Sequence, residues 1–212
     1  MSSQILSGAP FPKDSIAFVA SVNRLHRDTV AGWHERDPDN PYVGLMATIC
    51  QQHQFNFLLW HEEDIARSKD VSDARIAMVK RAIDGYNQNR NDWIERVDEA
   101  IIDALGESGV TPKADARLNT ETPGSAIDRL SIMSLRVYHL EEQLDRDDVD
   151  QAHCDKVNER LDRCRLQQAD LSNSLAELLG DLFSGEKLLK VYRQMKMYND
   201  ATLNPYLYKK AA

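Results

Sequence analysis

The chain has 212 residues, a formal net charge of −8 and 42% hydrophobic residues, which suits one domain or a single large helical bundle. The acidic balance excludes a general nucleic-acid-binding protein, because neutralising phosphates requires a basic surface. The first residues do not resemble a signal peptide, no stretch approaches the ~18 apolar residues of a membrane helix, and the three cysteines form no CxxC pair. We therefore expect a cytoplasmic protein with reduced thiols and no membrane segment.

Apolar residues at helical spacing predict three helices in the first half of the chain. The first spans Ser15 to about Glu35, with Asp14 or Ser15 as its N-cap. The second begins near Tyr42 and ends near residues 68–72, and the third runs from Asp73 to about Leu105. Two prolines, Pro38 and Pro41, mark the loop that separates the first helix from the second.

The second half predicts two further long helices and one short helix. After a loop over residues 106–122, a fourth helix starts with Thr122 as N-cap and Pro123 in its first turn. A fifth, from Asp147 to about Phe183, has the alternating four- and three-residue apolar spacing of bundle packing. A short sixth helix is predicted from Glu186 to about Tyr198.

These elements predict an all-α fold, an up-and-down bundle of about five long helices with a short C-terminal helix and a tail. We expect one domain over residues 1–212, with extended tails at residues 1–13 and 199–212. The line of apolar residues on the fifth helix and the aromatic tail exceed what one bundle is expected to cover. This surplus predicts a homodimer; the alternative is that the fifth helix lies at the centre of its own bundle with the tail laid over it.

The second helix carries the strongest candidate site. With about 100° of turn per residue, six residues that mix aromatic, basic, amide and acidic side chains fall within one arc roughly 100° wide. An ordinary solvent face rarely has this composition, which suits a half-buried polar pocket. The six residues are His53, Asn56, Trp60, Glu63, Asp64 and Arg67.

Each of these residue types suits a role in a pocket. Glu63 and Asp64 can bind Mg²⁺ or Mn²⁺ through oxygen, and His53 or His61 can act as a base or a ligand. Arg67 can hold a phosphate or carboxylate through two hydrogen bonds. The alternative pairs Arg67 with Glu63 one turn back, and lets His53 and its neighbours hydrogen-bond to other helices.

The start of the fourth helix is a second candidate. The first amides of a helix are unpaired and attract anions, so a phosphate can bind near Thr122, where Gly124 admits a ligand and Ser125 adds a hydroxyl. Asp128, one turn further, is a candidate metal ligand, and Arg129 a candidate ligand-binding residue. The alternative is a well-capped helix start with no ligand. We expect this segment and the arc of the second helix to line one cavity.

A polar stripe on the third helix is a weaker candidate. It adjoins the apolar seam, so it either faces a groove between helices or forms a solvated flank. Its ligand-binding candidates are Asp84, Gln88 and Asn91, and the stripe continues through Glu95 and Asp98.

Three segments together resemble a known bacterial family: LLWHEEDIAR, VKRAIDGYNQNRNDWIERVDE and LNTETPGSAIDRLSIMSLRVYH. The family is described only as a domain of unknown function, so the resemblance implies a soluble helical protein and no particular reaction. The chain is also loosely similar to all-α nucleotide pyrophosphatases, which bind Mg²⁺ with paired ExxE and ExxD motifs. Here HEED and DRLS stand in place of those motifs, and Glu63 and Asp64 with Asp84 or Asp128 would have to serve.

The leading interpretation is a metal-assisted hydrolase or transferase that acts on a phosphorylated small molecule, such as a nucleotide or nucleotide sugar. Glu63, Asp64 and Asp128 would hold Mg²⁺ or Mn²⁺, and His53, His61 or Asp64 would take part in catalysis. The alternative is a non-catalytic helical module that binds a ligand or a protein partner.

Overall fold

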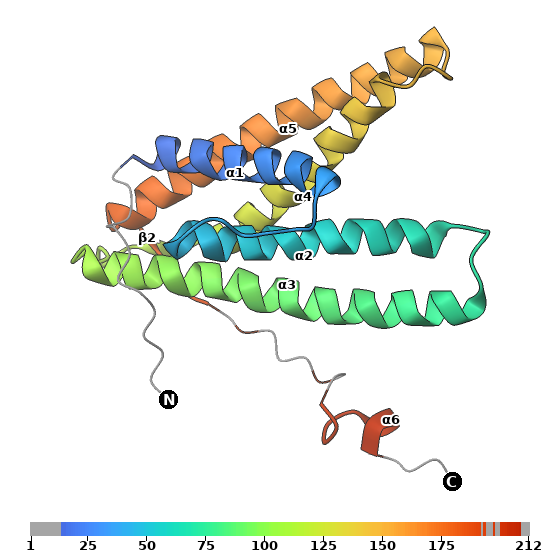
Figure 1. Cartoon of the computed structure of the whole chain (residues 1–212). Helices are drawn as coiled ribbons and strands as arrows, with labels where there is room; N and C mark the ends of the chain where they lie inside the picture. Colours follow the sequence, from blue (N-terminus) through green and yellow to red (C-terminus); the bar gives the residue numbers. More distant parts are fainter. Residues whose placement is uncertain (1–13, 192, 194–196, 198–199, 209–212) are drawn as a thin grey trace.

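The computed structural model describes residues 14–191, 193, 197 and 200–208, and the predicted all-α fold is confirmed (Figure 1). The described chain contains five long helices and one short one, with a single pair of two-residue strands. The long helices are α1 (Ser15–Glu35), α2 (Gly44–Arg67), α3 (Asp73–Glu107), α4 (Pro123–Leu144) and α5 (Gln151–Phe183).

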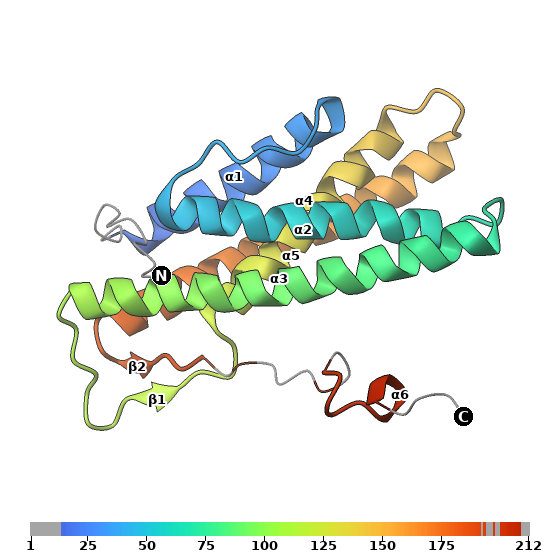
Figure 2. The ribbon, with the colours of Figure 1, turned by 60° about the horizontal axis from the view of Figure 1, so that its bottom comes forward.

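Two helical hairpins make up most of the bundle. Helices α2 and α3 pack side by side along their length, as do α4 and α5, and the second hairpin crosses the first obliquely (Figures 1 and 2). Helix α1 packs against α4 and α5 and also contacts α2. Helix α4 is therefore the central element, since it contacts every other long helix.

Side-chain caps explain where four of the five long helices begin. In each case an oxygen of the N-cap side chain accepts a hydrogen bond from the backbone N–H three residues later, satisfying one of the free amides of the first turn. The four caps are Asp14, Ser72, Thr122 and Asp150. The predicted N-caps Asp14 and Thr122 are among them.

The hydrophobic core lies where the two hairpins and α1 meet. All five long helices contribute to it, including Val22 and Trp33 of α1, Ile49 of α2, Ile127 of α4 and Leu179 of α5. Along α5, the predicted apolar line is buried within the chain itself, at Val157, Leu161, Cys164, Leu175, Leu178 and Leu182. Among the described helices, none combines the length and the apolar run needed to cross a bilayer.

The predicted sixth helix is wrong over the residues that the structure describes. Instead, β2 (Lys187–Leu188) pairs in parallel with β1 (Arg117–Leu118) beside the end of α5 (Figure 2). Gly185 makes the turn before β2 with a φ of 77°, and a Cβ there would lie 2.8 Å from the carbonyl oxygen of Thr111. A glycine is needed for this conformation and this close approach, and the chain leaves α5 in an extended form.

The C-terminal region differs from the prediction in a second respect. The short helix α6 (Pro205–Tyr208) lies within the segment predicted to be an extended tail. The predicted N-terminal tail, residues 1–13, and residues 199 and 209–212 lie outside the described part of the chain.

Candidate functional site

The polar arc on α2 divides between two different environments. Its first members, His53 and Asn56, are fully buried together with Gln52, and they contact α4 at Asp128 and Ser131. Its later members lie at the other end of α2, where the helix is partly exposed. The two parts therefore have different partners and different chemistry.

Asp128 is the centre of the buried network. Its Oδ1 accepts hydrogen bonds from Gln52 Nε2 (2.6 Å), Asn56 Nδ2 (2.9 Å) and Arg90 Nε (2.7 Å), and its Oδ2 accepts another from the same guanidinium. The network joins α2, α3 and α4. The hydrogen bond from Arg90 to Asp128 raises the pKa of the guanidinium. The sequence led us to expect Asp128 as a metal ligand; in the structure its carboxylate is held by these hydrogen bonds, and among the described residues it belongs to no metal-ligating group.

His53, a predicted catalytic residue, is held in this network as a neutral ring. Its Nε2–H donates to the carbonyl oxygen of His26 (3.2 Å), so Nδ1 accepts from the hydroxyl of Ser131 (2.6 Å). Burial lowers the pKa of His53 to about 3. With 0% exposure, the ring has no access to a substrate, and the expectation of a catalytic role for His53 is not supported.

A second buried histidine lies beside it. The ring of His26 is 4.5 Å from that of His53, and neither nitrogen of His26 has a hydrogen-bond partner in the described structure. Burial lowers its pKa well below the ordinary value, and the neighbouring imidazole lowers it further. The two histidines are therefore uncharged. Together with Ser131 they form a polar part of the core in which α1, α2 and α4 contact one another.

The predicted phosphate site at the start of α4 is occupied by the protein itself. The N–H of Gly124 donates to Oδ1 of Asp98 (2.6 Å), and the N–H of Ser125 donates to Oγ1 of Thr122 (3.2 Å). A Cβ at Gly124 would lie 2.6 Å from the carbonyl oxygen of Ile94. The glycine thus admits α3, not a ligand, and the alternative of a well-capped helix start fits the structure.

Asp98 is the unusual member of this cap. It is 2% exposed, and burial raises its pKa to about 6 despite the hydrogen bonds from Thr122 and Gly124. The polar stripe of α3 therefore ends inside the bundle, which fits the interpretation that it faces a groove between helices. The sequence placed Asp98 on this stripe but did not show that it caps another helix.

The remaining predicted residues lie on exposed or half-buried surfaces. Arg67 bonds Glu63 (3.1 Å) and Asp64 (3.2 Å), as the alternative pairing described. Asp84 pairs with Lys80 one turn back, and Gln88 donates to Asp92 (2.7 Å). Asn91 is half-buried, and Arg129 pairs with Glu121 (2.7 Å). Within the described residues, Glu63, Asp64 and Asp128 do not form a metal-ligating group.

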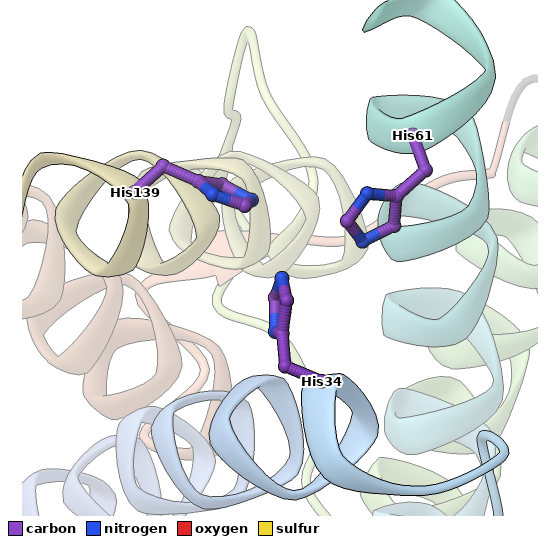
Figure 3. A group of neighbouring side chains, drawn as sticks. All are labelled: His34, His61 and His139. Carbon is purple, nitrogen blue, oxygen red and sulfur yellow. The ribbon is translucent and has the colours of Figure 1, made fainter. Parts of the chain in front are cut away.

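Three histidines from three helices form a different cluster. His34 is at the end of α1, His61 in the second half of α2, and His139 in the second half of α4, and all three are partly buried. One ligand nitrogen from each ring lies within 4.8 Å of the others. Figure 3 shows the three rings directed toward a common centre. Of the residues described, these form the one group of three or more histidine, cysteine or acidic side chains placed to share a metal ion.

Two of these imidazoles are held in one tautomer. The Nδ1–H of His34 donates to the carbonyl oxygen of Val30 (2.7 Å), and the Nδ1–H of His139 donates to Oε2 of Glu142 (2.6 Å). Because both partners are acceptors, the neutral rings carry their lone pairs on Nε2. Both Nε2 atoms are buried and lack a hydrogen-bond partner in the described structure.

Aromatic side chains enclose the cluster. Trp60 stacks on His139 with ring centroids 4.8 Å apart, Tyr138 stacks on His34 at 4.2 Å, and Phe57 meets His61 edge-on at 4.4 Å. Trp60, a predicted ligand-binding residue, thus packs directly against this cluster. Such packing fixes the ring planes, as a preorganised ligand set requires.

Burial and the two neighbouring imidazoles lower the pKa of His61, while the carboxylates of Asp64 and Glu142 raise it. Burial also raises the pKa of Tyr138, and the carboxylates of Glu142 and Glu35 raise it further. Carboxylates beside the imidazoles form an environment that favours a cation over an anion.

The site predicted as one cavity is therefore separated into two places. Asp128 meets the first half of α2, whereas His139 meets His61 further along the same helix. Ser125 and His139 are fourteen residues apart on α4, which is about 21 Å at 1.5 Å rise per residue. Glu63, two residues beyond His61, therefore does not share a site with Ser125.

Sequence reasoning included His61 but missed His34 and His139 as its partners. A local signal does exist in the sequence: each of the three follows an aromatic residue, in Trp33–His34, Trp60–His61 and Tyr138–His139. The other three histidines of the chain follow leucine, glutamine or alanine. The buried residues Gln52 and Ser131 and the partly buried Arg90 carry no such signal.

Comparison with known proteins places most of the chain in a family. A family described as a protein of unknown function (DUF4254) matches residues 46–191, which span α2 to the segment after β2 and include His61 and His139. His34 precedes the matched residues. A search of curated proteins and a search of solved structures gave no match. Because the match covers more than half of the chain, the chain belongs to the DUF4254 family, in agreement with the resemblance noted in its sequence.

Proposed function

We propose that this protein is a metal-assisted hydrolase that acts on a phosphorylated small molecule, with the metal held by His34, His61 and His139. The proposal keeps the reaction class expected from the sequence and moves the metal from carboxylates to imidazoles. The observation that carries it is the convergence of three imidazoles from three helices, two of them with a buried Nε2 that has no hydrogen-bond partner among the described residues.

A divalent ion at this place would supply two things that hydrolysis needs. It would lower the pKa of water at the site, and its charge would offset that of a phosphate. The second contribution matters because Asp64, Glu142 and Glu35 make the surroundings acidic. Without a metal, these carboxylates would repel a phosphate.

Two residues of the predicted arc keep roles in this proposal. Asp64, three residues beyond His61 and exposed, accepts the proton that water loses. Arg67 lies six residues beyond His61, about 9 Å along the helix at 1.5 Å rise per residue, and offers a second contact to the phosphate. In the reaction, the water oxygen bonds to phosphorus, the bond from phosphorus to the leaving oxygen breaks, and that oxygen gains a proton.

The test uses full-length protein without a polyhistidine tag, stripped of metal with a chelator and freed of the chelator. Phosphate or pyrophosphate release is measured over a panel of nucleotides, nucleotide sugars and sugar phosphates, with single divalent metals added back. We expect turnover that requires metal and is lost in His61→Ala. His153→Ala, on α5 and outside the cluster, is the control and should retain turnover.

The acidic surroundings favour a second candidate, a non-catalytic metal-binding or partner-binding module. Three carboxylates beside the cluster suit the retention of a cation without any anionic substrate. Metal binding at the three histidines with no turnover of any panel member supports this second candidate and contradicts the first.

Two further expectations from the sequence remain proposals: that the protein is cytoplasmic and that it forms a homodimer. The cytoplasm is supported by three unpaired cysteines, and burial raises the pKa of the Cys50 thiol to about 12, which keeps it unreactive. A homodimer is supported by exposed apolar side chains near the C-terminus, Leu203, Tyr206 and Leu207. Light scattering at micromolar concentration decides the second, since a mass near 24.1 kDa would contradict a dimer.

A further inference from the structure

We infer that the cluster of His34, His61 and His139 is selective for a metal of the zinc class, bound with four-coordinate geometry and one open position, and that Glu142 is its positioning residue. This inference concerns the same site as the proposed function and rests on it for the role of the metal in catalysis. It replaces the Mg²⁺ or Mn²⁺ expected from the sequence.

The donor atoms determine the class of metal. The cluster offers three uncharged nitrogen donors, whereas Mg²⁺ is held by oxygen ligands in a nearly ideal octahedron. Imidazole suits Zn²⁺ and its neighbours in the transition series. Three protein ligands with a fourth position left to water are the usual arrangement of a catalytic zinc site.

The geometry lies within reach of such a site. The three ligand atoms lie within 4.8 Å of one another. Around a tetrahedral zinc with Zn–N bonds of about 2.0–2.1 Å, ligand nitrogens are roughly 3.4 Å apart. Each pair of ligand nitrogens therefore has to approach by at most about 1.4 Å, which small side-chain rotations supply. The stacked Trp60 and Tyr138 limit those rotations to the ring planes already present.

Glu142 acts through His139. Its carboxylate accepts the Nδ1–H of that ring at 2.6 Å, which directs the Nε2 lone pair to the centre of the cluster and makes it a stronger donor. The Val30 carbonyl does the same for His34 at 2.7 Å without a charge. Hydrogen-bonded partners of this kind typically change metal affinity by roughly 10–100-fold.

The chain offers a matched control for Glu142. The preceding residue, Glu141, is also a glutamate on α4 with a similar exposed fraction, 47% against 44% for the side chains. Its carboxylate pairs with Arg165 of α5 at 2.8 Å, on the other helix of the hairpin, and not with a histidine of the cluster. Both substitutions remove one negative charge from the same turn, so a difference between them reports the hydrogen bond to His139.

The experiment measures metal binding by the tag-free, metal-stripped full chain. Zn²⁺ affinity is measured by competition with a chromophoric chelator, and Co²⁺ serves as a spectroscopic substitute. We expect one Co²⁺ per chain with the intense visible absorption of four-coordinate cobalt, displaced by Zn²⁺ but not by millimolar Mg²⁺. His61→Ala should abolish the band, and His153→Ala should retain it. Circular dichroism of both metal-free variants establishes that they are folded.

For the positioning role, Glu142→Ala should weaken Zn²⁺ binding by about 10–100-fold, with Glu142→Gln in between and Glu141→Ala unchanged. Equal affinity of the Glu141 and Glu142 alanine variants would overturn that role. If the His61 variant is unfolded, His139→Ala takes its place. A cobalt band that survives in that variant shows that the metal does not bind at this cluster. Mn²⁺ or Mg²⁺ binding at the histidines at least as tightly as Zn²⁺ overturns the selectivity.

These outcomes separate the inference from the proposed function. A histidine-dependent, four-coordinate cobalt spectrum without turnover of any phosphorylated compound upholds the inference and contradicts the hydrolase. Histidine-dependent turnover with Mg²⁺ and none with Zn²⁺ upholds the hydrolase and contradicts the inference.

Discussion

Removing the carboxylate of Asp128 should destabilise the bundle more than removing an exposed charge. The Asp128 side chain is 6% exposed and its partner Arg90 is 25% exposed. Asp128→Ala would leave that guanidinium, Gln52 Nε2 and one bond of Asn56 without their acceptor. Removing one partner of a buried ion pair typically costs about 3–5 kcal/mol, and the partial exposure of Arg90 favours ~3 kcal/mol.

This loss is large relative to the total stability of a domain, about 5–15 kcal/mol. For a chain of this size it corresponds to a fall in Tm of roughly 6–12 °C. The assay is urea denaturation of the metal-free protein followed by circular dichroism, with Tm as a second measure. Arg129→Ala is the control, because the pair of Arg129 and Glu121 is exposed and should contribute within about 1 kcal/mol.

A double-mutant cycle isolates the pair. Adding Arg90→Met to Asp128→Ala removes the uncompensated charge, so the double variant should be more stable than Asp128→Ala alone, with a coupling energy above about 1 kcal/mol. The reasoning is refuted if Asp128→Ala is as stable as the unaltered protein, or more stable. That result would mean that the carboxylate is unfavourable when no metal is bound, and would return Asp128 to the metal ligands expected from the sequence.

Three further predictions follow from particular contacts. Gly124→Ala should lower the unfolding free energy, measured in urea, by about 1–3 kcal/mol, because the added Cβ would lie 2.6 Å from the Ile94 carbonyl oxygen. An unchanged denaturation midpoint would contradict the tight contact of α3 with α4. Asp98, whose folded pKa is raised from 3.8 to about 6, adds stability below pH 4 that is lost as the pH rises through 6. Asp98→Asn should therefore remove up to about 3 kcal/mol from the pH dependence of the unfolding free energy. If the unfolding free energies of the variant and the unaltered protein change equally between pH 4 and pH 7, the raised pKa of Asp98 is disproved. Asp64→Ala should lower turnover by at least about 100-fold, as expected for the loss of a general base. The same change should alter the unfolding free energy by less than about 1 kcal/mol, because the Asp64 side chain is 58% exposed. A large fall in Tm with unchanged kcat would mean that Asp64 has a structural role and no catalytic one.

The helices could be predicted from the sequence because the interactions that make them are local. The Thr122 cap and Pro123 lie within one turn of each other, and the apolar line of α5 repeats every three or four residues. Such signals do not depend on the rest of the fold. Where a structure rests on distant partners, prediction failed: β2 exists only because Lys187 pairs with Arg117, seventy residues earlier.

The site was predicted in part for the same reason. Helical periodicity placed His53, Trp60 and Asp64 on one face of α2, and the mixed composition of that face led us to predict a pocket there. Periodicity cannot say which helix lies opposite each residue. The oblique crossing of the two hairpins brings Asp128 to the first half of α2 and His139 to the second, so one predicted pocket became a buried network and a histidine cluster.

What the sequence determined by itself was therefore the all-α class, the approximate extents of the five long helices and the polar character of α2. Only the tertiary structure decided that Asp98 caps α4 across 26 residues, and that His34 meets His61 and His139. The physical reason is range. Helix formation follows from neighbours within about one turn, whereas the contacts of a side chain across the core depend on how whole helices pack against one another.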